Sequence, residues 1–403
     1  MLKPFFINTN LCYGPEDCQT SAQFFDNVAG NTGNSYIGYS IIKILYGKLI
    51  KVPEIKNIFS YDFKNQDALI HEINTKYSHV IFCLQDQLRN SQSYGIRPNW
   101  KKITEFISRI DKPLLVISLG TNSFKGEGQD YYKNFDPELV RFLHVISEKV
   151  YSLGVRGLSS ERVLHKLGIK NAAPVGCPAF FEMGINRKPI QKKLPVPTAI
   201  LSPSDGGRSV LQDEQTLFRC LYWPAENFSI PKSLRLPNLL SLPFQKGFAS
   251  IELWKKFVSN FDYNYSSRMH GGILSLNCGI PAVMTNDDLR SHEMCSLFKI
   301  PYVPGGGDPI ELYKQADFGP MNNAYPTLYK NFMSFSTENG FDQTAISALH
   351  KEAESLPEVQ PFELPINDKI ASEVERALKS YKFYVPTKIL FKLLLKKLTG
   401  KRH

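Results

Sequence analysis

The sequence predicts an α/β fold in which two domains face each other across a cleft, with further helices at the C-terminal end. Three observations lead to this prediction. The chain has 403 residues, more than a single hydrophobic core usually supports, so two domains are expected. Short apolar runs alternate with helical patterns, which is typical of parallel sheets covered by helices. A polar, proline-rich stretch, Asn186–Pro197, interrupts the alternation and is predicted to link the domains.

The first domain is predicted to span residues 1–185 and to alternate strands with helices. Its predicted strands are Phe5–Asn8, Ile58–Tyr61, His79–Leu84, Leu114–Leu119 and Tyr151–Val155. Its predicted helices are Ser35–Lys48, Gln66–Lys76, Trp100–Ile110, Glu138–Val150 and Ser160–Leu167.

The second domain is predicted to span residues 198–365, where the alternation resumes after the linker. Its predicted strands are Thr198–Leu201, Asn238–Leu242, Tyr263–Tyr265 and Ala282–Met284. Its predicted helices are Ser209–Tyr222, Ile251–Val258, Met269–Cys278 and Leu289–Phe298, and residues 324–356 are predicted to be helical throughout. Because ligands bind outside the carboxyl ends of parallel strands, two facing domains would enclose a site for two substrates.

The C-terminal segment, residues 366–403, is predicted to form a helix, Asp368–Lys382, and a basic amphipathic tail. The net charge of the chain is +10, and the 23 residues from Tyr381 onward carry seven of its basic side chains and no acidic ones. The rest of the chain is therefore only weakly basic, which argues against a nucleic-acid partner. The tail is too short to span a bilayer but suits the surface of an anionic membrane, although a helix packed on the body would have the same pattern.

Cysteine usage and the N-terminus indicate a reduced compartment. The seven cysteines are odd in number and contain no C-x-x-C pair, so neither a disulfide framework nor a zinc site is predicted. The apolar run after Met1 is too short for a signal peptide. We therefore expect a cytoplasmic protein, held by its tail to the inner face of the plasma membrane.

The strongest candidate for chemistry is the segment from Arg268 to Gly272, which follows a short strand and begins an apolar helix. A helix N-terminus attracts anions, and Arg268 adds a fixed cation with fork-like donors. His270 can exchange a proton near neutral pH, although the helix dipole favours its neutral form. Gly271 and Gly272 would allow a ligand to approach closely.

Five other segments are candidates for substrate binding. The residues Asn31, Thr32, Gly33 and Asn34 suit an anion cradle at the start of a helix, and equally an ordinary capped turn. Further candidate binding residues follow predicted strands or begin predicted helices: Thr121, Asn122, Arg156, Arg208 and Arg290. Each of these also suits a surface loop or a helix cap.

Acidic residues and one histidine gather around Arg290, at Asp287, Asp288, His292 and Glu293. A metal site is one interpretation, but acidic residues are routine at the start of a helix, so no metal is predicted. The chain lacks the phosphate-binding G-x-x-x-x-G-K-[ST] loop and the hydrolase pattern G-x-S-x-G.

Together, the order and spacing of these motifs resemble the polysaccharide pyruvyl transferase family over roughly residues 5–305. The resemblance is carried by Asn31-Thr32-Gly33-Asn34, Val155-Arg156-Gly157-Leu158-Ser159-Ser160, Arg268-Met269-His270-Gly271, Gly279-Ile280-Pro281 and Asp287-Asp288-Leu289-Arg290. Three residues depart from the family's pattern, because Asn34, Gly157 and Cys177 stand where an acidic residue is usual.

The resemblance implies two Rossmann-like domains in a GT-B-like arrangement, with the acceptor on the first and the donor on the second. It implies transfer of a pyruvyl group from phosphoenolpyruvate to two hydroxyls of a sugar, on a surface polysaccharide or a lipid-linked oligosaccharide. By that likeness Arg268 would bind the donor's phosphate or carboxylate, and His270 would be the general acid or base. This chemistry needs a proton carrier and clustered cations, so no cofactor is expected.

Two other functions remain open from the sequence. The same fold could use a nucleotide sugar as a glycosyltransferase, and a non-catalytic protein of polysaccharide biosynthesis could also carry it. Arg268 and His270 together favour an enzyme over a binding protein.

Overall fold

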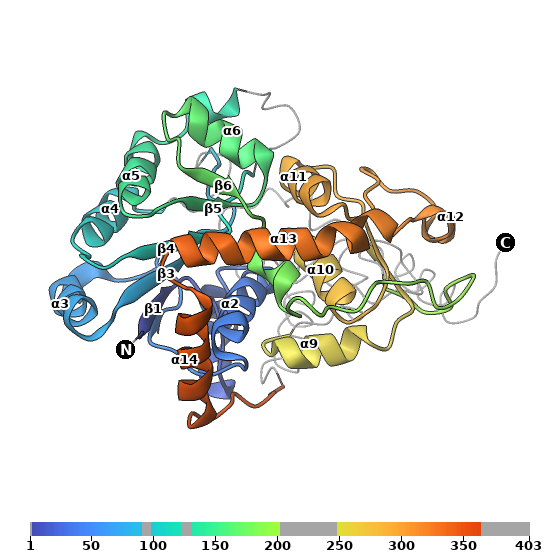
Figure 1. Cartoon of the computed structure of the whole chain (residues 1–403), viewed down its shortest axis with the longest axis horizontal. Helices are drawn as coiled ribbons and strands as arrows, with labels where there is room; N and C mark the ends of the chain where they lie inside the picture. The colour runs from blue at the N-terminus through green and yellow to red at the C-terminus, as the bar shows by residue number, and fades with distance from the viewer. Residues whose placement is uncertain (1, 91–97, 123–129, 202–247, 364–403) are drawn as a thin grey trace, which may run out of the picture.

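The protein is described by a computed structural model that covers residues 2–90, 98–122, 130–201 and 248–363. It is a mixed α/β structure in which every pairing between named strands is parallel. We call residues 2–185 the first half and residues 198–318 the second half (Figure 1). Four sequence predictions lie outside the described residues: the helix 209–222 with Arg208 before it, the strand 238–242, the helix 368–382 and the basic tail.

The first half contains a four-stranded sheet in the order β2-β1-β3-β4 and a two-stranded sheet, β5-β6. A parallel bridge from Leu119 to Val155 joins β4 to β5, so all six strands follow one another in space. The strands are β1 (Pro4–Ile7), β2 (Glu54–Ile55), β3 (His79–Cys83), β4 (Leu114–Ile117), β5 (Leu153–Val155) and β6 (Ala172–Pro174).

Alternating side chains of the central strands enter two different hydrophobic cores. Phe6 and Ile81 belong to one core, whereas Phe5, Val80 and Phe82 belong to the other. Successive strand residues point to opposite faces, so both faces of the sheet are buried, as expected for a parallel sheet. The core that contains Phe6 continues without a break into the second half.

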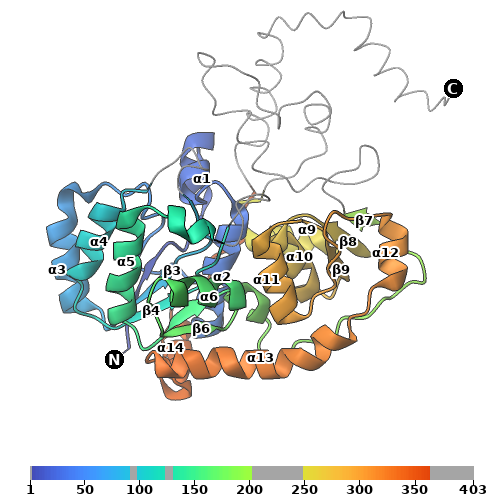
Figure 2. The ribbon, with the colours of Figure 1, turned by 90° about the horizontal axis from the view of Figure 1, so that it is seen from above.

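Helices surround this sheet (Figures 1 and 2). They are α1 (Ser21–Asn27), α2 (Thr32–Tyr46), α3 (Gln66–Lys76), α4 (Trp100–Ser108), α5 (Pro137–Glu148) and α6 (Leu158–Lys166). The described part of this half also contains the 3-10 helices η1 (Pro15–Cys18), η2 (Phe63–Asn65), η4 (Tyr131–Asn134) and η5 (Pro178–Phe181).

The second half has the sheet β7-β8-β9, extended by a bridge from Met284 to Tyr302. Its strands are β7 (Ile200–Leu201), β8 (Tyr263–Ser266) and β9 (Ala282–Met284). Its helices are α9 (Ile251–Val258), α10 (Met269–Asn277), α11 (Leu289–Phe298) and α12 (Pro309–Gln315).

The chain then returns to the first half. Helix α13 (Gly319–Glu338) runs across both halves, and α14 (Gln343–Glu354) packs against α2 (Figures 1 and 2). Backbone pairing of Ile50 with Glu358 holds the segment after α14 in place.

The predicted elements that fall on described residues agree with the structure to within about two residues except at three places, and α1, β6 and α12 have no predicted counterpart. Residues 58–61 form a turn, because the second strand is Glu54–Ile55 and the Ile58 amide donates to the Asn8 side chain. Helix α2 begins at Thr32 rather than Ser35, because the Asn31 side chain accepts from the Gly33 amide and caps it there. The predicted helix 324–356 is broken after α13, where Gly340 has a φ of 93°. That two Rossmann-like domains face each other across a cleft stays a prediction.

Candidate active site

The first turn of α10 is held at the carboxyl end of β8 by a buried asparagine. Asn264 Nδ2 donates to the carbonyl of Gly271 at 3.2 Å and to Ser275 Oγ at 2.6 Å. Arg268 is the N-cap of α10, and its amide donates to Ser266 Oγ at 3.2 Å. The predicted segment therefore lies where the sequence analysis places it, with Arg268 half-buried and Gly271 buried.

His270 lies at the junction of the two halves, and only 8% of it is exposed. Its Nε2 is 3.6 Å from Cys177 Sγ, at the N-cap of η5 in the first half. Its Nδ1 faces α2, because a methyl group in place of a Gly33 hydrogen would lie 2.9 Å from it. The imidazole is thus enclosed between the first turns of α2 and α10.

Several effects lower the pKa of His270 well below its usual range. Burial is the largest, because it penalises the charged imidazolium, and the positive charges of Arg156 and Arg290 act in the same direction. The carboxylate of Asp86 opposes them only in part. His270 is therefore neutral near pH 7 in the unliganded protein, in line with the preference expected from the helix dipole.

The predicted anion cradle at Asn31–Asn34 forms the first turn of α2. Asn31 Oδ1 accepts from the Gly33 amide at 2.9 Å, and Thr32 and Asn34 are buried. The sequence alone could not place this turn beside His270, because Asn34 and His270 are 236 positions apart in the chain. Packing of α2 on α10 brings them together.

Arg156 is almost entirely enclosed at the carboxyl end of β5, with 1% of it exposed. Its Nε donates to Ser118 Oγ at 3.1 Å. A methyl group at Gly120 would lie 2.4 Å from Arg156 Cδ, so the glycine makes room for this side chain. Burial of a guanidinium costs free energy unless a negative charge or hydrogen bonds compensate it. The enclosed position of Arg156 therefore suits a group that binds an anion.

Arg290 connects α11 with the loop after β3. Its guanidinium lies 3.5 Å from the Asp86 carboxylate and 3.0 Å from that of Asp288, the N-cap of α11. Burial raises the pKa of Asp86, but Arg89, Arg290 and Arg156 outweigh it and lower that pKa to about 2. Asp86 is therefore a fixed negative charge among the arginines.

Thr121 and Asn122 bind polar groups of the protein itself. Thr121 donates through its amide and its hydroxyl to Glu293 Oε1, at 3.3 and 3.1 Å, and Asn122 Nδ2 donates to Asp86 Oδ2 at 2.5 Å. Glu293, on α11, also accepts from the amide and the hydroxyl of Ser160. Thr121 thus helps to join the two halves, and its assignment as a substrate contact stays a prediction.

Four non-glycine residues at the carboxyl ends of β1, β3 and β4 adopt left-handed backbone conformations. Asn8, Asn10, Gln85 and Ser118 have φ values of 62°, 56°, 58° and 60°, and all four are buried. Such conformations cost about 1 kcal/mol or more each and gather at functional sites. This edge of the sheet adjoins Arg156 and Asp86.

Sequence reasoning missed three residues of this site: Asp86, Ser118 and Glu293. Asp86 follows the predicted strand His79–Leu84, and Ser118 lies at the carboxyl end of the predicted strand Leu114–Leu119, so a place near a strand end was the signal that could have found them. Glu293 was considered as a metal ligand, whereas the structure engages it with Thr121 and Ser160.

The described residues offer no group of three or more His, Cys, Asp or Glu side chains arranged for a metal ion. They also contain no helix long and apolar enough to cross a membrane. Arg208 lies outside the described residues.

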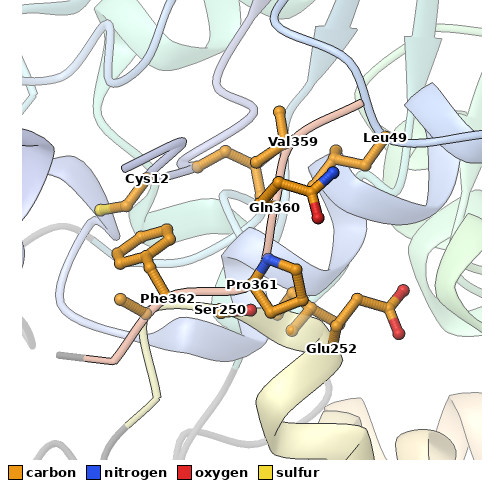
Figure 3. Close-up of a pocket in the computed structure, with 11 residues that line it drawn as sticks. Cys12, Leu49, Ser250, Glu252, Val359, Gln360, Pro361 and Phe362 are labelled. Atoms are coloured by element: carbon orange, nitrogen blue, oxygen red, sulfur yellow. The ribbon is translucent and has the colours of Figure 1, made fainter. Parts of the chain in front are cut away.

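A pocket lies elsewhere, between the loop after β1, the N-terminus of α9 and the segment after α14 (Figure 3). Cys12, Ser250, Glu252 and Phe362 are among its lining residues, and none of the predicted site residues lines it. The pocket is therefore lined by other residues than those described around His270.

The comparison that decides the family is a sequence profile. The profile described as polysaccharide pyruvyl transferase matches residues 31–288, well over half of the chain. The chain belongs to the polysaccharide pyruvyl transferase family. The matched region runs from the N-cap of α2 to the N-cap of α11, so it contains both helix starts that enclose His270.

This pyruvyl transferase is thus an enzyme of polysaccharide biosynthesis that acts on a sugar or polysaccharide acceptor. No individual curated protein matches the chain significantly. Because the matched region contains both helix starts that enclose His270, the residues around His270 are the candidates for the reaction centre of this pyruvyl transferase.

Proposed function

We propose that this pyruvyl transferase moves the pyruvyl group of phosphoenolpyruvate onto two hydroxyls of a sugar, on a surface polysaccharide or its lipid-linked precursor, and closes a cyclic ketal. One observation carries the proposal. His270 lies between two helix N-termini, close enough to Arg156 and Arg290 for their charges to lower its pKa. Helix N-termini and guanidinium groups complement the phosphate and carboxylate of this donor.

The reaction needs one proton carrier and stabilisation of negative charge. Protonation of the donor's methylene carbon gives an oxocarbenium-like centre, which one sugar hydroxyl attacks. The phosphate then leaves with the C–O bond electrons, and the second hydroxyl closes the ketal. Of the two hydroxyl protons released, one balances the proton taken up by carbon and the other goes to solvent or phosphate.

The residues divide these tasks by their chemistry. Arg268 binds the donor's phosphate or carboxylate at the start of α10, and Arg156 and Arg290 add positive charge nearby. His270 is the general acid or base. His270 is neutral in the free protein, and a bound anionic donor raises its pKa and favours the imidazolium. His270 therefore carries the proton for the reaction when substrate is present.

Ligand stabilisation tests the donor. We expect phosphoenolpyruvate to raise the melting temperature of the full chain, because a ligand that binds only the folded state stabilises it. A panel of nucleotides and nucleotide sugars is the comparison. Stabilisation by a nucleotide sugar alone would instead identify a glycosyltransferase.

Replacement of His270 tests the proton carrier. We expect His270→Ala to reduce phosphate release in the presence of acceptor by about 100-fold or more, as for loss of a general acid or base. An unchanged far-ultraviolet circular dichroism spectrum would show that the fold is kept. His144→Ala, which removes an exposed histidine of α5, is the matched control. Full activity of His270→Ala would refute the assignment.

We also propose that the basic tail holds the enzyme at the inner face of the plasma membrane, where a lipid-linked acceptor would be available. The support is the sequence alone, because Lys388, Lys392 and Lys396 recur at helical spacing among Leu and Ile residues. We expect the full chain to float with anionic liposomes and a truncation after Lys382 to remain behind. Equal flotation of both would rule out the tail as anchor.

A further inference from the structure

A chain of hydrogen bonds leads from Arg156 to His270. Arg156 Nε is 3.1 Å from Ser118 Oγ, which is 3.3 Å from Cys177 Sγ, which in turn is 3.6 Å from His270 Nε2. All four residues are buried, with exposed fractions of 1%, 0%, 0% and 8%. They come from four separate segments, and the last step crosses from the first half to the second.

The direction of this chain follows from the chemistry of its first member. A guanidinium can only donate, so Ser118 Oγ accepts from Arg156 and directs its own hydrogen to Cys177 Sγ. The sulfur also accepts from the amide of Ala179. Burial raises the pKa of the Cys177 thiol, so its S–H hydrogen is retained. Because the Ser118 hydroxyl directs its own hydrogen to the sulfur, the S–H hydrogen is directed to the other neighbour, His270 Nε2.

We propose that Cys177 is a positioning residue, which holds His270 as the tautomer that carries its proton on Nδ1. Nε2 accepts from the thiol, so the single proton of the neutral imidazole is on the other nitrogen. Nδ1 is the atom that faces Gly33 and the first turn of α2. His270 therefore presents a donor to the first half of the chain, toward Asn31–Asn34.

A thiol at this position has a second consequence, because it brings no negative charge to the imidazole. Among the described residues, Arg156 and Arg290 lower the pKa of His270 and so favour its neutral form, and Asp86 opposes them. A carboxylate in place of the thiol would accept from Nε2 and favour the imidazolium. The thiol thus keeps His270 neutral and orients it at the same time.

Nitrogen-15 spectra of the imidazole rings test the tautomer directly. Long-range proton–nitrogen correlations of the full chain, labelled at histidine, distinguish the two neutral tautomers, and the His270→Gln spectrum identifies the signals of His270. We expect the Nδ1-protonated pattern in the unliganded protein near pH 7. The Nε2-protonated pattern, or an imidazolium at that pH, would overturn the proposal even if both Cys177 variants failed to fold.

Two substitutions at Cys177 separate positioning from mere packing. Cys177→Ser keeps one donor and should retain the Nδ1-protonated pattern, whereas Cys177→Asp should move the proton to Nε2 and raise the pH at which His270 titrates. If Cys177→Asp folds and leaves the tautomer unchanged, Cys177 does not position His270.

The role in turnover depends on the proposed function, whereas the spectra need no substrate and stand without it. In the enzyme assay, Cys177→Asp should shift the limb of the kcat/KM profile that His270 controls to higher pH, because the added carboxylate raises the pKa of His270, and Cys177→Ser should leave that limb within about a few tenths of a pH unit, as expected when one uncharged donor replaces another. If the Cys177→Asp enzyme is active and this limb does not shift, Cys177 does not act on catalysis through His270. The tautomer of His270 would then be decided by the spectra alone.

Discussion

Gly120 shows how little freedom the residues around His270 have. It follows β4, and a methyl group at its position would lie 2.4 Å from Arg156 Cδ and 3.1 Å from Arg156 Cγ. Arg156 cannot retreat into solvent, because only 1% of it is exposed. A guanidinium that is enclosed in this way is oriented before any substrate arrives, which is what transition-state stabilisation requires.

We therefore predict that Gly120→Ala displaces Arg156 and breaks its hydrogen bond to Ser118. The expected cost is about 1–3 kcal/mol of stability, as for overpacking of a core, together with a loss of donor binding. Thermal unfolding and donor titration would measure the two effects. Gly307→Ala is the matched control, because its added methyl group would make ordinary contacts of 3.6 Å or longer. Wild-type stability and binding in Gly120→Ala would contradict this account of Arg156.

At the level of elements, α11 is tied to α6 by a carboxylate from the opposite half. Glu293 accepts from the Ser160 amide at 3.0 Å and from the Thr121 amide at 3.3 Å, and both hydroxyls donate to it. Ser160 lies in the first turn of α6, where free amides and the helix dipole favour a negative charge. Glu293 thus acts as a capping group that also aligns α11, which carries Arg290.

Glu293→Gln should loosen this junction. An amide brings two N–H donors to a place that already holds four donors, so at least one buried donor loses its acceptor, at about 1–3 kcal/mol. We expect a lower melting temperature and a higher KM for the donor, because α11 would no longer hold Arg290 in its position beside Asp86. Ser296→Ala, at an exposed position of the same helix, should change neither. An unchanged melting temperature in Glu293→Gln would show that the capping contact adds little.

At the level of the whole molecule, a buried ionic cluster joins the halves farther along α2. The Glu182 side chain is fully buried and lies 2.8 Å from Lys43 Nζ and 2.6 Å from Lys255 Nζ. Tyr36 donates to the same carboxylate at 2.8 Å, and Asn277 donates to the Tyr36 hydroxyl. One carboxylate thereby connects α2, the segment after η5, α9 and α10.

The pKa of Glu182 sets the pH range over which this cluster stabilises the fold. Burial alone would raise that pKa, but the charges of Lys255 and Lys43 outweigh it and lower it. A carboxyl group with a depressed pKa in the folded state stabilises the fold above its unfolded pKa of about 4.3. That contribution is lost as the pH falls through the lower, folded-state pKa.

We predict that Glu182→Gln lowers the free energy of unfolding by about 3 kcal/mol at pH 7, because two lysines lose their buried counter-ion. The difference from wild type should shrink at pH values well below 4, where both proteins carry a neutral side chain. Denaturant titrations at the two pH values measure it. Glu72→Gln, which breaks an exposed pair with Lys76, should cost less than about 1 kcal/mol. A difference that does not depend on pH would exclude this electrostatic explanation.

Most strands and helices could be predicted from the sequence, because they depend on local periodicity and capping. Helices α3, α9 and α11 have their predicted bounds, and Arg268 and His270 lie at the start of a helix as expected. Predictions failed where a distant contact overrides the local pattern. The turn at residues 58–61 is an example, since Ile58 bonds to Asn8, fifty residues earlier.

The sequence by itself determined the α/β character of the protein, the order of its elements and the motifs that indicate its family. Only the tertiary structure decided which side chains meet. It placed Cys177 beside His270, Ser118 beside Cys177, Glu293 against Ser160, and α14 against α2. These contacts join residues far apart in the chain, and packing of whole helices and strands creates them. Neither periodicity nor capping, which act over a few residues, carries that information.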